Sequence, residues 1–377
     1  MTTRSSIQSD VPARVAVRRD RRIFLSGLAA SASFLSACSA TGLGSVLEGK
    51  PAKSEGPGRA ALLAPVSGRS PQLGQIMRNA ATLGGNTLSD TGEMAFFDSG
   101  DTPETAATAA RLAVAAGARM IVGPLFGAQV AAVAQAVGSN VAVLTLSNDV
   151  NVAGGGVFVL GVTPEQSARA VLTFAARRGL NTVGVVVLTG AFGARSAEAA
   201  LLVGKGTGQT VLPPITETDP AIALAKLTKA NGGTLPKAVY LPGAGAELEA
   251  LASAFRGKTQ VLGSTQWSSR DPGNLPSLRD AWYAAPDPLA FEPFAVAYQE
   301  AHGSSPGILA GVAFDGVETA RLLGRIQEQT ASGLTRDKGF SGVLGPYKFN
   351  KSGQCSRGLA VLNVGAGAIT MIGSASA

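Results

Sequence analysis

The chain has 377 residues, 45% of them hydrophobic, and a formal net charge of +7 at pH 7. This length exceeds that of the smallest single domains and is sufficient for two compact lobes. More than half of the excess positive charge lies in residues 1–37, so the remainder lacks the clustered basic stripe of a nucleic-acid-binding protein. One histidine and two cysteines form no set of metal ligands at helical or turn spacing. We therefore predict no nucleic-acid partner, no metal and no cofactor.

Residues 1–37 are predicted to be an export signal. A basic cluster at residues 18–22 precedes an apolar run at 23–37, which ends in Leu35-Ser36-Ala37-Cys38. The run is shorter than the about 18 apolar residues of a membrane-spanning helix. Residues 20–26 resemble the twin-arginine export motif, and the four closing residues resemble the bacterial lipoprotein box. We expect an exported protein that faces the periplasm or cell exterior and is anchored to the membrane by a lipid on Cys38.

Two further features follow from this anchor. Residues 38–58 are small, polar and rich in Gly, Pro and Ser, which predicts a flexible tether. Ser39 is not the aspartate that retains many lipoproteins at the inner membrane, so the outer membrane is favoured if the bacterium has one. With Cys38 given to lipid, Cys355 has no cysteine partner, and we predict no internal disulfide.

From residue 59 onward, short apolar runs alternate with helical segments. The strands are predicted, in chain order, at residues 60–66, 94–97, 119–122, 141–146, 157–162, 182–188, 210–215, 238–241 and 260–263. Their continuous apolar character is typical of parallel strands covered on both faces. A capping residue followed by proline opens helices at Ser70-Pro71, Thr102-Pro103, Thr163-Pro164 and Asp219-Pro220.

After residue 287 the alternation changes. Two consecutive helices are predicted at residues 291–302 and 308–329, followed by a β segment at 340–372. The pattern predicts an α/β protein with two lobes, each a mostly parallel sheet flanked by helices. We assign residues 59–160 and 289–335 to lobe 1, and 161–288 and 336–377 to lobe 2. Three crossover segments are expected, at 157–162, 283–288 and 332–342.

The sequence favours a binding protein over an enzyme. It contains no G-x-S-x-G elbow, and His302 lies beside Gly303 at a predicted helix C-terminus. Gly243-Ala244-Gly245 is a partial dinucleotide fingerprint, because Leu248 replaces its third glycine. In open α/β sheets, ligands bind at the carboxyl ends of the strands. The candidate cleft residues are Ser67, Gly68, Phe126, Gly127, Ser147, Asn148 and Asp149 in lobe 1, Phe192, Gly243, Glu247 and Trp267 in lobe 2, and Asp315 in the second late helix.

Each candidate taken singly is also explained by turn chemistry, because Gly permits positive φ and Ser or Asn bonds the local backbone. Phe192 and Trp267 differ from the others, since each places an aromatic ring in a polar loop.

Several segments resemble the type I periplasmic binding proteins of the leucine/isoleucine/valine-binding kind. The resemblance rests on residues 61–68, 102–124 and 298–317, on 157–164 as the first crossover, and on 342–353 near the end. It implies two lobes that close by a hinge over a small ligand, without catalysis, and an ABC permease as partner. Amino-acid-binding members hold the ligand carboxylate with hydroxyl and N–H groups of one lobe, and its ammonium with an acidic residue and a tyrosine of the other.

The chain departs from this pattern. Phe126-Gly127-Ala128 stands where a serine is usual, and Phe192 stands where a tyrosine is often found. Residues 264–268 contain no acidic side chain, although Glu247 lies near a candidate position. An ammonium without an anionic partner is poorly compensated in a closed cleft, which weakens the case for a free amino acid.

The chain also resembles a second group of proteins that have this fold. Residues 63–69 and Gly123-Pro124-Leu125 resemble lipoproteins that activate penicillin-binding proteins. That resemblance implies a peptidoglycan synthase as partner. We favour the receptor for an amino acid or related small solute, and keep the cell-wall regulator as the alternative.

Overall fold

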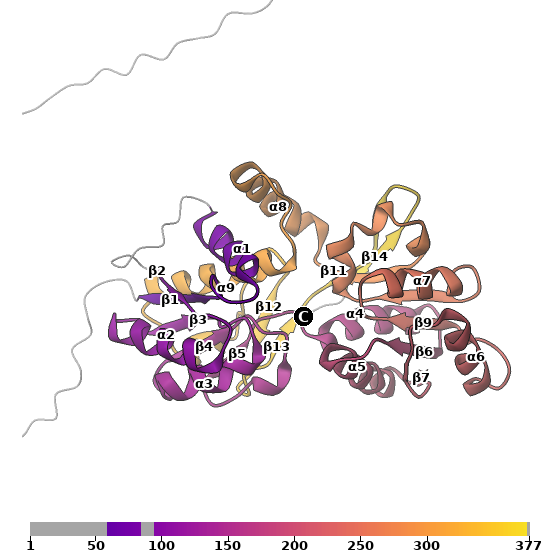
Figure 1. Ribbon diagram of the computed structural model, residues 1–377, viewed down its shortest axis with the longest axis horizontal. Helices are drawn as coiled ribbons and strands as arrows, with labels where there is room; N and C mark the ends of the chain where they lie inside the picture. The colour runs from indigo at the N-terminus through magenta and orange to yellow at the C-terminus, as the bar shows by residue number, and fades with distance from the viewer. Residues whose placement is uncertain (1–58, 84–93, 375–377) are drawn as a thin grey trace, which may run out of the picture. The chain divides into compact units, whose positions relative to one another are not determined.

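The computed structural model describes residues 59–83 and 94–374 (Figure 1). The predicted export signal, the lipidation at Cys38 and the tether lie outside these residues. Within them the chain forms two larger sheets, each flanked by helices, and a small two-stranded sheet. The predicted two-lobed α/β fold is therefore confirmed. No helix in the described ranges has both the length and the apolar character needed to cross a membrane.

The first sheet is parallel and has the strand order β2-β1-β3-β4-β5. Its strands are β1 (Ala60–Ala64), β2 (Met94–Asp98), β3 (Met120–Val122), β4 (Ala142–Thr145) and β5 (Val157–Val159). Their carboxyl ends therefore lie at one edge of the sheet. The strands β1, β3, β4 and β5 are shorter than the apolar runs predicted for them, because the last residues of several runs turn into loops at that edge, whereas β2 extends one residue further, through Asp98.

Helices cover both faces of this sheet. They are α1 (Pro71–Thr82), α2 (Pro103–Ala115), α3 (Gly127–Val137) and α9 (Ile308–Arg325). Leu62 lies in one apolar cluster with Met77 of α1 and Val317 of α9. Leu63 lies in another, with Ala110 of α2 and Val130 of α3. Successive residues of a strand point to opposite faces, so a strand covered on both sides is apolar throughout.

Capping residues start the helices where the sequence predicts. The Thr102 side chain accepts a hydrogen bond from the N–H of Thr105, and Thr163 does the same for Gln166. Asp219 caps the helix α6 (Pro220–Ala230) through the N–H groups of its second and third residues. Ser70 precedes α1 but makes no side-chain capping bond. The start of α1 is therefore favoured by Pro71 at its first position and not by a cap from Ser70.

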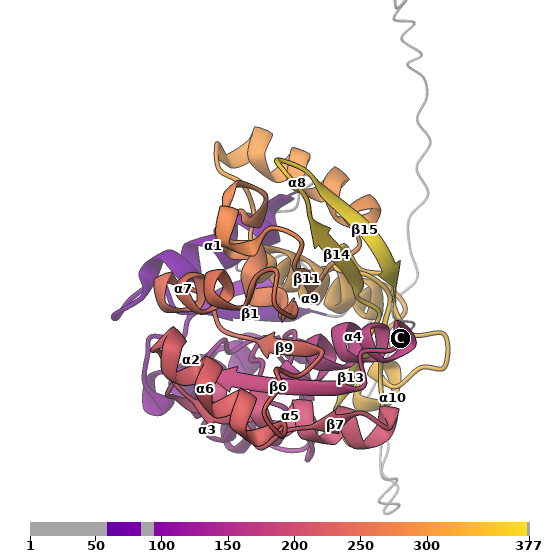
Figure 2. The ribbon, with the colours of Figure 1, turned by 90° about the vertical axis from the view of Figure 1, so that its right-hand side faces the viewer.

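The second sheet has the order β15-β14-β11-β10-β9-β6-β7, with β8 paired to β6. Its strands are β6 (Thr182–Val187), β7 (Thr210–Val211), β8 (Ile215–Thr216), β9 (Ala238–Leu241), β10 (Gln260–Gly263), β11 (Trp282–Ala285), β14 (Ala360–Val364) and β15 (Ile369–Ser374). β14 is antiparallel to both of its neighbours, and Figure 2 shows it beside β15 as a yellow ribbon pair.

The helices α4 (Pro164–Arg177) and α5 (Ala191–Thr207) pack on one face of this sheet, where Leu172 and Ala199 share a cluster with Val185. The helices α6 and α7 (Ala246–Phe255) pack on the other face, where Leu227 and Leu251 share a cluster with Val239.

Two predicted segments differ from the structure. Residues 210–215 form two short strands, β7 and β8, because Pro213 and Pro214 between them have no N–H group for a ladder. The segment 283–288, expected as a crossover, begins inside the strand β11, and only its last residues lead to the helix α8 (Pro288–His302). Three short 3₁₀ turns precede β11 and obscure the usual helix–strand alternation.

The final β segment is interrupted by turns. After α10 (Ala331–Leu334) come the hairpin strands β12 (Tyr347–Phe349) and β13 (Cys355–Arg357), then β14 and β15. Gly353, with φ of +80°, lies in the hairpin turn, and a Cβ there would collide with the carbonyl of Val157. The hairpin thus lies directly against the end strand of the first sheet.

A buried ion pair joins the segments that run between the two sheets. Asp315 of α9 and Arg357 of β13 are 3.0 Å apart, with side-chain exposures of 1% and 0%. The Asp315 carboxylate also accepts the N–H of Val343 at 2.7 Å, and Arg357 donates to the carbonyl of Leu160 at 3.4 Å. The guanidinium lies over the ring of Tyr347, 4.6 Å from its centroid. One pair therefore holds α9, the segment after β5 and the hairpin together.

We expect Asp315→Asn to lower the free energy of unfolding by about 3–5 kcal/mol, because it leaves the buried Arg357 charge without its partner. Urea unfolding followed by circular dichroism measures the change. Arg270→Gln, which breaks the exposed pair between Arg270 and Glu249, is the control and should change stability by at most about 1 kcal/mol. Equal effects of the two substitutions would contradict this role for the buried pair.

Candidate functional site

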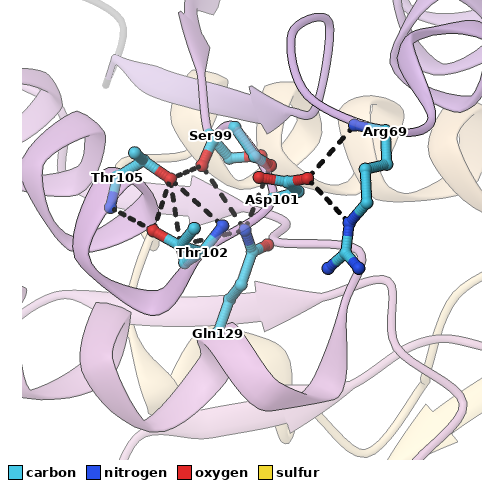
Figure 3. Close-up of polar contacts among 7 residues, drawn as sticks. Arg69, Ser99, Asp101, Thr102, Thr105 and Gln129 are labelled. Carbon is cyan, nitrogen blue, oxygen red and sulfur yellow. Dashed lines mark hydrogen bonds and ion pairs between the residues drawn. The ribbon is translucent and has the colours of Figure 1, made fainter.

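The loops after β1 and β2 are joined by two carboxylates. Asp98 accepts hydrogen bonds from the N–H groups of Val66 at 3.1 Å, Ser67 at 3.3 Å and Gly100 at 2.9 Å. Asp101 accepts both the N–H and the Nε of Arg69, at 3.1 and 3.2 Å (Figure 3). Ser67 and Gly68 are exposed between these anchors. Gly68 has a φ of +90°, and a Cβ there would lie 2.7 Å from the Asp101 carboxyl carbon, so this position requires glycine.

A buried amide fixes the loop after β2 to α3. The Gln129 side chain is fully buried, and its Nε2 donates to the carbonyls of Gly100 at 3.1 Å and Thr102 at 3.2 Å (Figure 3). Thr105 adds a hydrogen bond from its hydroxyl to the carbonyl of Ser99 at 2.8 Å. The edge of the sheet near Ser67 is therefore a fixed surface. The sequence carries no signal for this use of Gln129, which stands in an otherwise ordinary Ala-rich helix.

The loops after β3 and β4 meet at Gly127. A Cβ on this residue would lie 3.1 Å from the Ser147 hydroxyl and 3.4 Å from the Asp149 Cβ. Ser147 is 3% exposed, and its hydroxyl accepts the N–H of Asp149 at 3.1 Å. Phe126 precedes α3 as its N-cap and makes no side-chain capping bond, and Asn148 is half-buried. The structure thus brings Phe126, Gly127, Ser147 and Asp149 together.

An ion pair connects this group to the second sheet. Arg195 Nη2 lies 2.5 Å from Asp149 Oδ2, and the two side chains are 31% and 14% exposed. Arg195 belongs to α5, one turn after Phe192, which is half-buried at the start of the same helix. This Asp149–Arg195 bridge places opposite charges face to face between the strand ends of the first sheet and α5.

The sequence analysis did not single out Arg195. Arg195 stands in the second turn of α5, and nothing in the local sequence identifies Asp149 as its partner.

Three further candidates, Gly243, Glu247 and Trp267, follow the strands β9 and β10 of the second sheet. Gly243 faces Leu188, which would be 3.4 Å from an added Cβ, and Glu247 is exposed in the first turn of α7. Trp267 is 0% exposed, donates its indole N–H to the carbonyl of Leu241 at 3.1 Å and stacks on Tyr283. Its ring lies against Gly263, where any Cβ would collide with it. The structure therefore gives Trp267 a packing role.

Asp315 likewise lies inside the fold, in the buried pair with Arg357, and offers no surface to a cleft. No group of three or more His, Cys, Asp or Glu side chains in the described ranges could hold a metal ion.

The chain belongs to the periplasmic binding protein family, whose model matches residues 57–368. The family is a ligand-binding one, and its name implies an extracytoplasmic location. Comparison with curated protein sequences gives no significant match.

Three solved structures illustrate the range of similar folds. A putative branched-chain amino acid ABC transporter from Rhodospirillum rubrum is 19% identical with a TM-score of 0.72, covering 84% of this chain and 100% of that one. A Rhodopseudomonas palustris solute-binding protein in complex with 3,4-dihydroxybenzoic acid is 15% identical with a TM-score of 0.62, covering 85% and 97%. Full-length LpoA from Haemophilus influenzae is 18% identical with a TM-score of 0.65, covering 84% of this chain and 59% of LpoA. These similarities show the fold.

The loop anchored by Asp98 should respond to pH. Partial burial raises the pKa of Asp98, but hydrogen bonds from the Ser67 side chain and from the N–H groups of Gly100, Ser67 and Val66 outweigh it, so the pKa is lowered from 3.8. A lowered pKa means that the native state favours the carboxylate. The Asp98 carboxylate therefore makes its whole contribution to stability at pH values above the ordinary pKa of an aspartate. That contribution is lost as the pH falls through and below this pKa.

We therefore expect Asp98→Asn to destabilise the protein at neutral pH, with the difference from wild type shrinking as the pH falls below about 4. Urea unfolding at a series of pH values measures this convergence. Asp337→Asn, at a fully exposed side chain, is the control and should have little effect at any pH. A difference at Asp98 that stayed constant with pH would contradict the assignment.

Proposed function

We propose that this protein is an exported, lipid-anchored receptor that binds an amino acid or a related small solute between its lobes and delivers it to an ABC-type importer. The observation that carries the proposal is the Asp149–Arg195 bridge, which sets a carboxylate and a guanidinium face to face at the strand ends. Ligands of open α/β sheets bind at this edge.

The bridge has the charges that a zwitterionic ligand requires. A ligand carboxylate can replace Asp149 as the partner of Arg195, assisted by the Ser147 hydroxyl and the uncapped N–H groups at the start of α3. A ligand ammonium can replace Arg195 as the partner of Asp149. Exchange of both partners leaves no partly buried charge unpaired, whereas a simple carboxylate would leave Asp149 without a cation.

The bridge supplies the acidic residue that is missing from residues 264–268. Phe126 and Phe192, half-buried beside the bridge, favour an apolar side chain on the ligand. Solved relatives include both a leucine-binding protein from Thermotoga maritima and proteins in complex with benzoates. The pairing of charges favours the amino acid over the benzoate for this chain.

A second function is supported by the same bridge. Because Asp149 and Arg195 satisfy each other, the chain can hold its lobes together with its own side chains and present a fixed surface to a protein partner. The likeness to LpoA agrees with this alternative, in which the protein activates a penicillin-binding protein that synthesises peptidoglycan.

Leucine should raise the melting temperature of the purified protein, and at a hundred times its dissociation constant should stabilise it by about 2.7 kcal/mol. Asp149→Asn and Arg195→Gln should each weaken leucine binding about tenfold or more. Lys226→Gln, which breaks the exposed pair with Glu217, is the control and should bind as wild type does. Isothermal titration calorimetry measures leucine binding by the wild type and the three variants. The same proteins are titrated with 4-hydroxybenzoate, which represents the competing class of ligand.

Tighter binding of 4-hydroxybenzoate than of leucine would overturn the zwitterion argument. If neither binds and a peptidoglycan synthase co-purifies with the protein, the receptor proposal is wrong and the regulator is supported.

Anchoring has its own test. Labelled palmitate supplied to cells should be incorporated into the wild-type protein and not into Cys38→Ala, because the lipid is attached at that residue. Cys355→Ala, which removes the other cysteine, should be labelled as wild type is. Label retained in Cys38→Ala would show that the anchor lies elsewhere.

A further inference from the structure

A cavity of about 610 Å³ lies beside the segments that run between the two sheets. Its walls come from the first turns of α4, from Leu202 of α5, from the hairpin β12–β13, and from Val150 and Val159 of the first lobe. This volume is within the range of about 300–1,000 Å³ that small-molecule sites occupy. None of the candidate residues at the strand ends lines it. We call it the crossover cavity.

The walls of the crossover cavity carry an excess of positive charge. Arg169, Lys348 and Arg357 line it, against one carboxylate, Glu165. Arg357 is paired with Asp315 behind the wall, yet its Nε is buried without a hydrogen-bond partner. Lys348 lies 3.6 Å from Asp337, a fully exposed side chain whose attraction is screened by water. The cavity therefore favours an anion.

The remaining lining is partly apolar. Leu202 is 58% exposed and Val150 is half-buried, so both offer apolar surface to the cavity, while Val159 and Phe349 lie buried behind its wall. Leu202 follows Arg195 by seven residues, so both lie on the same face of α5. Leu202, which lines the crossover cavity, therefore lies two turns along α5 from the Asp149–Arg195 bridge.

Hydrogen bonds hold two of the walls in place. Gln166 of α4 donates its side-chain N–H to the carbonyl of Cys355 at 2.7 Å, and the same amide takes part in the Thr163 capping box. The start of α4 and the strand β13 therefore keep a fixed separation, which gives a ligand a preformed surface.

We propose that the crossover cavity is a second ligand site, which takes an organic anion with an apolar body. The anion pairs with Arg169 and Lys348, and its body packs against Leu202 and Val150. Because residues of both lobes line the cavity, a bound anion favours the arrangement of lobes in which these walls are together. It therefore acts on the strand-end site without occupying it.

The test uses naphthalene-2-sulfonate as the probe and the full-length chain carrying Cys38→Ala, which removes the predicted lipid and leaves Cys355 as the only thiol. Isothermal titration calorimetry should show saturable binding. Arg169→Glu and Leu202→Glu should each raise the dissociation constant about tenfold or more. Both positions are exposed, so the folded structure should persist, which circular dichroism verifies.

Matched controls lie on the same helices. Arg177→Glu at the end of α4 and Leu201→Glu on α5 are exposed but do not line the cavity, and they should bind within about twofold of the parent. A second readout is the alkylation of Cys355 by N-ethylmaleimide, which the bound probe should slow because this thiol lines the cavity. Absence of saturable binding, or equal effects of lining and control substitutions, would overturn the proposal.

Discussion

The buried pair between Asp315 and Arg357 is the interaction on which the arrangement of the chain depends. Burial raises the pKa of Asp315, and the hydrogen bonds from Arg357 and Val343 oppose that rise. Two charges out of contact with water are favourable only when all of their partners are present. Those partners come from α9, from the hairpin and from the segment after β5, which are far apart in sequence. The pair therefore requires α9, the hairpin and the segment after β5 to be in place at once.

The Asp149–Arg195 bridge is a different kind of contact. Its side chains are 14% and 31% exposed, against 1% and 0% for the buried pair, so water screens it and its partners can be exchanged. In the proposed receptor, the buried pair would stay unchanged while a charged ligand replaced the bridge, and the burial of the two ion pairs suits these two roles.

The proposed strand-end site and the proposed second site in the crossover cavity share the helix α5. Arg195 lies on the face of that helix toward the first, and Leu202 lies two turns along the same face in the second. Because one rigid helix contributes to both, a ligand bound at one of them can affect binding at the other through that helix. The coupling would be a free energy shared by both ligands and hence reciprocal.

The sequence by itself determined the two-lobed α/β fold, because parallel strands buried on both faces must be continuously apolar and because capping residues with proline mark the helix starts. It also placed Gly127, Ser147 and Asp149 at one strand edge. Only the tertiary structure decided which side chains pair with one another. Trp267 and Asp315 stand at positions where the sequence predicts cleft residues. In the structure the Trp267 ring packs against Gly263, and Asp315 pairs with Arg357 in the interior. Arg195 meets Asp149 only once both lobes are folded, since side chains distant in sequence acquire partners through packing and local pattern carries no record of that.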